Sequence, residues 1–185
     1  MSKGEFLTRA TIWITIVTYA VGSGVFALAG TRSRSDSTAI SRLDSVARVV
    51  WTIAVISLIA HFIFAFQFYH AWSHDSAYRD TARQTEEITG LNWGGGLYIN
   101  YAFLAIWTAD VAWWWLAGLS SYRARPWPLT IIWHGLLILI IFNASVVFEN
   151  GIVRWLGLAI CISLFLTWTL IASQRSTRNL ALARD

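Results

Sequence analysis

The sequence predicts an all-α integral membrane protein, with five transmembrane helices in a single bundle and one extramembrane helical loop. Three numbers carry this prediction: 56% of the 185 residues are hydrophobic, 13% are charged, and the mean hydropathy is +0.53. A soluble domain has about 25% charged residues, so this chain has too few charges to cover a surface in water. Two prolines and one cysteine argue against a disordered chain and against a disulfide framework.

Five apolar segments are each long enough to cross a hydrocarbon core of about 30 Å as a helix. They are residues 10–30, 49–72, 97–119, 128–148 and 152–172. None shows the alternation of polar and apolar residues that is typical of a membrane barrel. The first segment also resembles a signal peptide, with Lys3 and Arg9 before it and Ala27-Leu28-Ala29 at its end. Its length favours a retained helix, and we expect residues 1–185 to form one polytopic domain.

Residues 73–96 are the one substantial connection on their side of the membrane. Ser73 to Glu87 is predicted to continue the second span as a helix beyond the bilayer, with i,i+4 ion pairs between Asp75 and Arg79 and between Arg83 and Glu87. The glycines at 90 and 94–96 end this helix, and Trp93 lies where an aromatic residue would anchor at the membrane surface.

The remaining connections are short, which makes consecutive helices antiparallel neighbours. Pro128 suits the first turn of the fourth span, because that position needs no backbone N–H. Glu149-Asn150-Gly151 is predicted to form a tight turn between the fourth and fifth spans.

The positions of Lys and Arg predict how the chain is oriented, because cytoplasmic loops carry an excess of these residues. The less basic side holds five of them: Lys3, Arg9, Arg79, Arg83 and Arg154. The other side holds nine: Arg32, Arg34, Arg42, Arg48, Arg123, Arg125, Arg175, Arg178 and Arg184. We therefore expect a multi-pass protein of the cell inner membrane, with the N-terminus outside and the C-terminus in the cytoplasm.

The basic residues are spread singly or in pairs beside apolar segments, so the pI of 9.6 does not indicate binding to nucleic acid. The lipid bilayer is the first expected partner. Other membrane subunits or a second copy of the chain are expected next, and Gly22-Ser23-Gly24 offers a smooth helix surface for such association.

The first candidate site lies at the end of the second span. His70 and His74 are four residues apart, which places them on one face if the helix continues. With Asp75 beside them they could hold copper, zinc or iron. The alternative is an interfacial girdle of aromatic and histidine side chains.

The second candidate site lies inside the membrane. His61 and Asp110 fall at similar depth on the second and third spans, so we expect a contact between them if these helices are neighbours. His134 lies about 6 Å shallower and could join them, or serve with His61 as an axial ligand of haem b. Trp107 and the run 113–115 could form walls for a macrocycle, or an aromatic belt. The alternative for Asp110 is a hydrogen bond that joins helices.

Several chemistries are excluded by the sequence. No lysine lies within a span, so a retinal Schiff base is excluded, and no phosphate-binding loop, nucleophile elbow or CxxCH motif occurs. Three functions stay open. The first is a metal- or haem-binding redox-associated membrane subunit, and the second is a non-catalytic subunit of a larger complex. The third is a small transporter or proton-conducting protein.

Overall fold

The computed structural model describes residues 2–31 and 37–182, and over these residues the chain is helical and has no strand. The elements in chain order are α1 (Lys3–Thr31), α2 (Ser37–Phe68), α3 (His74–Thr89), α4 (Gly96–Ala124), α5 (Trp127–Phe142), the short π-helix η2 (Asn143–Val147) and α6 (Gly151–Leu182). Three basic residues counted for the orientation lie outside the described residues: Arg32, Arg34 and Arg184.

Five helical segments are long and apolar enough to cross a membrane. They are Lys3–Gly30, Ile40–Phe68, Gly96–Ala124, Trp127–Val147 and Gly151–Ser173. The prediction of an all-α protein with five membrane-spanning helices is therefore confirmed. The second span begins earlier and ends earlier than the predicted range of 49–72.

The chain divides into two compact units. The α3 unit contains the residues up to Thr18 together with Trp51–Leu116, and so holds the first half of α1, the end of α2, α3 and most of α4. The α5–α6 unit contains Tyr19–Val50 and the residues from Ala117 onward.

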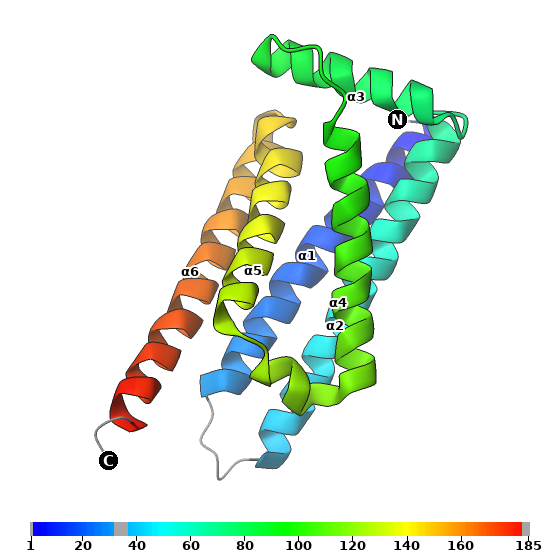
Figure 1. The fold of residues 1–185 in the computed structure, drawn as a ribbon. Helices are drawn as coiled ribbons and strands as arrows, with labels where there is room; N and C mark the ends of the chain where they lie inside the picture. Colours follow the sequence, from blue (N-terminus) through cyan, green and yellow to red (C-terminus); the bar gives the residue numbers. More distant parts are fainter. Residues whose placement is uncertain (1, 32–36, 183–185) are drawn as a thin grey trace. The chain divides into compact units, whose positions relative to one another are not determined.

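In the α3 unit, α3 lies across the ends of α2 and α4 (Figure 1). The prediction that α3 continues the second span is wrong, because the chain turns between Phe68 and His74. Ala71 and Trp72 have φ of 46° and 60°, values that end a right-handed helix. Ser73 then starts α3, since its hydroxyl oxygen accepts a hydrogen bond from the backbone N–H of Ser76 at 3.2 Å.

In the α5–α6 unit, α5 and α6 run side by side (Figure 1). Pro128 lies in the first turn of α5, as predicted. A Cβ added at Gly157 of α6 would come within 2.6 Å of the Cβ of Ser145. The missing side chain at Gly157 thus allows α6 to approach η2 closely.

α4 contains a break at Gly118, where φ is 78° and ψ is 172°. Glycine tolerates this conformation because it has no Cβ. The break falls next to the predicted end of the third span at residue 119, and the seven residues after it include the arginines described below.

Candidate functional site

His134 of α5 is the most buried histidine, with 1% of its surface exposed. Its Nδ1 lies 3.0 Å from the hydroxyl oxygen of Tyr19 on α1, and its Nε2 lies 3.0 Å from Nη2 of Arg125. The imidazole also stacks on Trp168 of α6, with ring centres 3.5 Å apart and planes 18° apart. His134 therefore joins α1, α5, α6 and the segment between α4 and α5.

Arg125 is buried beside this ring, with 6% of its surface exposed. Its Nε donates to the hydroxyl oxygen of Thr130 at 3.1 Å, and its guanidinium carbon lies 4.2 Å from the centre of the Tyr122 ring. A guanidinium only donates hydrogen bonds, so Nε2 of His134 must accept from it. The neutral imidazole then carries its proton on Nδ1 and donates it to the oxygen of Tyr19.

A second polar contact in the same unit joins Arg123 to Asp44, whose side chain is fully buried. Nε of Arg123 donates to one carboxylate oxygen at 2.9 Å, and Nη2 donates to the other. The guanidinium carbon lies 4.3 Å from the centre of the Phe26 ring. Two parallel hydrogen bonds to one carboxylate are among the stronger polar contacts in proteins. This pair ties the start of α2 to the end of α4.

Aromatic side chains connect the two contacts. Phe26 lies edge-on to Tyr122 with ring centres 6.2 Å apart, and 6.3 Å from the ring of Trp168. We call these residues the polar cluster: Tyr19, Phe26, Asp44, Tyr122, Arg123, Arg125, Thr130, His134 and Trp168. Its contacts run between helices, as expected of polar residues that hold membrane helices together.

His61 and Asp110, the predicted pair within the membrane, both lie in the α3 unit. Nδ1 of His61 lies 2.9 Å from the carbonyl oxygen of Thr8, so this histidine joins α2 to α1. Asp110 is buried on α4, with 9% of its surface exposed. Among the residues that the structure describes, no hydrogen bond joins His61 to Asp110.

The expectation that His134 ligates haem iron gains no support from its surroundings. Both ring nitrogens already contact protein groups, and Trp168 covers one face of the ring.

The tryptophans of α4 divide into two kinds. Trp107 and Trp114 have 1% and 0% of their surface exposed, and Trp114 packs against Trp51 with ring centres 5.7 Å apart. Trp113 and Trp115 are exposed, and Trp115 donates to the hydroxyl of Thr52 at 2.9 Å. Trp107 and Trp114 thus belong to the core of the α3 unit rather than to an aromatic belt.

The three predicted metal ligands near α3, His70, His74 and Asp75, each contact a different protein group. Nδ1 of His70 lies 3.2 Å from a carboxylate oxygen of Asp80, an ion pair by distance but without hydrogen-bond geometry. The two ring nitrogens of His74 lie 3.2 Å from the hydroxyls of Tyr98 and Tyr101.

Asp75 pairs with Arg79, as predicted, but Arg83 pairs with Asp80 at 3.1 Å rather than with Glu87. Over residues 2–31 and 37–182, no three His, Cys, Asp or Glu side chains are grouped so that they could hold a metal ion. The prediction that His70 and His74 share a helix face is wrong, because the turn before Ser73 separates them.

Most of the polar cluster was not predicted from the sequence, including Tyr19, Asp44 and Trp168. Arg123 and Arg125 were expected only as charges that flank a span. One signal was present: Asp44 is an acidic residue beside a span on the side predicted to hold Arg123. A tyrosine or tryptophan among apolar residues gives no comparable signal, because its packing depends on the other helices.

No protein-family model matches this chain, and no curated protein or solved structure matches it either.

Proposed function

We propose that this membrane protein is a non-catalytic structural subunit of a larger membrane assembly. One observation carries the proposal: each of the four histidines contacts a polar group of its own chain. The partners are the Thr8 carbonyl for His61, Asp80 for His70, two tyrosine hydroxyls for His74, and Tyr19 with Arg125 for His134.

These contacts favour a structural role for His74 and His134, whose two ring nitrogens both contact protein groups. A stable metal site needs three or four ligands with free donor atoms, and haem ligation needs a ring nitrogen that faces iron. His134 would have to give up Tyr19 or Arg125 to ligate iron. Breaking such a buried contact leaves a polar group unsatisfied.

The exposed side chains of α6 fit an assembly. Trp155 and Phe165 have 67% and 60% of their surface exposed, and both lie on a helix that crosses the membrane. Large aromatic side chains are enriched where membrane or protein partners meet a surface. The partner we propose is another membrane subunit or a second copy of this chain. No contact among the described residues favours transport.

The test is the size of the complex in native membranes. The tagged chain is extracted in mild detergent with native lipids and separated by native electrophoresis, with mass analysis of the band. We expect a discrete complex heavier than one 20.8 kDa chain with its detergent. A single chain alone in the band would contradict the proposal.

Spectroscopy of the same preparation separates the proposal from the redox alternative. We expect no Soret band and less than one copper, zinc or iron per chain. A Soret band lost in His61→Ala or His134→Ala, or a bound metal lost in His70→Ala, would establish the redox function instead. Arg79→Gln is the matched control, because the side chain of Arg79 is 69% exposed and lies outside the spans.

A further inference from the structure

One face of α3, which we call the underside, is less polar than the opposite face, which we call the upper side. Ala77, Thr81, Thr85 and Ile88 follow one another at intervals of three and four residues, so they share one face of the helix. Ala77 is fully buried against the α3 unit, so this face points toward the ends of the spans. Arg79 and Arg83 lie on the opposite face and are 69% and 65% exposed.

Beyond the packed part of α3, the underside is left uncovered. Ile88 continues the face of Ala77, yet 46% of its surface is exposed. Leu91 and Trp93 follow in the connection to α4 and are 67% and 52% exposed. This apolar tip, residues 88–93, ends three residues before α4 begins at Gly96, and α4 is a membrane-spanning helix. The tip is therefore continuous with the surface that contacts lipid.

The tip is held in shape by its own hydrogen bonds. Gly90 has φ of 76° and ends α3, and its N–H donates to the carbonyl oxygen of Glu86 at 2.8 Å. Nδ2 of Asn92 donates to a carboxylate oxygen of Glu86 at 2.6 Å. The backbone N–H of Leu91 donates to the hydroxyl of Thr89 at 3.2 Å. The exposure of Leu91 thus belongs to an ordered turn.

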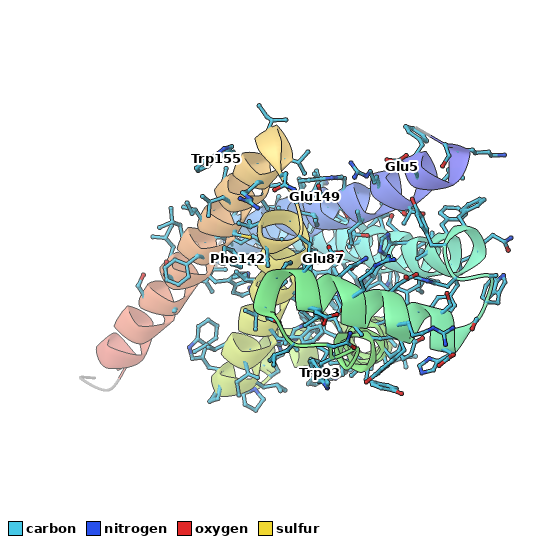
Figure 2. The ribbon with its side chains drawn as sticks, turned by 90° about the horizontal axis from the view of Figure 1, so that it is seen from above. Glu5, Glu87, Trp93, Phe142, Glu149 and Trp155 are labelled. Atoms are coloured by element: carbon cyan, nitrogen blue, oxygen red, sulfur yellow. The ribbon has the colours of Figure 1, made fainter. Side chains whose placement is uncertain are left out.

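The other end of α3 carries two exposed aromatic residues. Tyr69 and Trp72 have 51% and 61% of their surface exposed, in the turn that leaves α2. Tyrosine and tryptophan favour the headgroup region, where an apolar ring and a polar group can both be satisfied. Figure 2 looks down on the upper side of α3, with Glu87 and Trp93 labelled.

We infer that the apolar tip inserts into the headgroup region of the bilayer and anchors α3 on the membrane surface. The occupant of this surface is lipid with a zwitterionic headgroup. α3 contains four acidic residues and two arginines, so attraction to anionic lipid does not drive the contact. Apolar insertion does, through Ile88, Leu91 and Trp93.

The experiment places a fluorescent probe at the tip of the purified full chain in phosphatidylcholine vesicles. Cys161 is first replaced by serine, and Leu91→Cys then carries an environment-sensitive dye. The matched control is Glu87→Cys, which lies beside the tip on an exposed part of α3. We expect the Leu91 probe to emit at shorter wavelength, to lose most of its emission to spin-labelled lipid, and to resist aqueous iodide. The Glu87 probe should show the reverse, and added phosphatidylglycerol should change neither result.

Equal quenching of both probes by iodide would overturn the inference. So would a Leu91 probe that is exposed in vesicles of the pure protein but shielded in native membranes, since that result assigns the tip to a protein partner. Ile88→Cys gives a second position on the same tip if the Leu91 variant does not fold. The vesicles contain only this chain, so the outcome does not depend on the proposed assembly.

Discussion

The Arg125 guanidinium sets the protonation pattern of the imidazole beside it, because Nη2 can only donate to Nε2 of His134. We predict that nitrogen NMR of labelled His134 shows the proton on Nδ1. In Arg125→Met the donor is lost, so the proton should redistribute toward Nε2. The unfolding free energy should also fall by about 1–3 kcal/mol, since a buried acceptor loses its partner. A wild-type ring with its proton on Nε2 would contradict this arrangement.

The buried carboxylate of Asp44 makes a second prediction at the same scale. Asp44→Asn removes the charge that faces Arg123, so we expect a loss of about 3–5 kcal/mol in detergent unfolding, as for other broken buried pairs. The double variant Asp44→Leu with Arg123→Leu should be less destabilised than Asp44→Asn alone.

Asp75→Asn is the control for this pair. Asp75 also faces an arginine, but its side chain is 72% exposed, so the loss should be about 0–1 kcal/mol. Equal losses in Asp44→Asn and Asp75→Asn would mean that burial of the Asp44–Arg123 pair has no effect on stability.

Helices could be predicted from the sequence where a single property determines their position. Length and apolar content define the five spans, and the fourth and fifth appear within one residue of their predicted bounds. The turn between α2 and α3 was missed, because the spacing of His70 and His74 fits a helix and says nothing of the φ values at Ala71 and Trp72. Ser73 was the available signal, as a serine with an acidic residue two positions later is typical of a helix start.

The Ser73 cap can be tested directly. We predict that Ser73→Ala destabilises α3 by about 1 kcal/mol, because the N–H of Ser76 loses its acceptor. Hydrogen exchange should increase in the first two turns of α3 and remain unchanged in α5. Ser73→Asp should restore protection, since aspartate also caps helices. Unchanged exchange in Ser73→Ala would show that the turn rather than the cap defines the start of α3.

The close approach of α6 to η2 gives a further prediction for an element. We expect Gly157→Ala to lower the unfolding free energy by about 1–3 kcal/mol, because the new methyl group would overlap Ser145. Gly135→Ala is the matched control on α5, since a Cβ there meets no atom within 4 Å. It should leave stability unchanged or raise it by up to about 1 kcal/mol, as alanine favours helix. Equal destabilisation by both would exclude steric contact as the cause.

The site was less predictable than the elements, for a reason that concerns the whole molecule. Periodicity and depth place His61 and Asp110 at one level, but they do not say which neighbouring group each side chain reaches. His61 finds a backbone carbonyl of α1, and His134 finds a tyrosine and an arginine. Backbone carbonyls and tyrosines occur in every span, so only the packed structure selects among them. A histidine or aspartate in a membrane helix thus indicates where a polar contact forms, but it does not indicate which group is the partner.

We predict that the charges at the ends of the helices determine the orientation of the chain, and this can be tested by moving them. With Cys161 replaced by serine, a cysteine at Gln84 should react with an impermeant maleimide in intact cells, and one at Thr38, an exposed residue just before the second span, should not. Nine basic residues lie on the predicted cytoplasmic side and five on the predicted outer side, which favours an N-terminus outside and a C-terminus in the cytoplasm. Lys3 and Arg9 oppose this orientation at the first helix. Replacing Lys3 and Arg9 by glutamine leaves three basic residues on the predicted outer side and nine on the predicted cytoplasmic side. A larger fraction of the chains should then have the predicted orientation. Replacing Arg32, Arg34, Arg42 and Arg48 leaves five against five, and both cysteine positions should then react in part of the population. A chain that keeps one orientation after that change would show that the basic residues do not determine it.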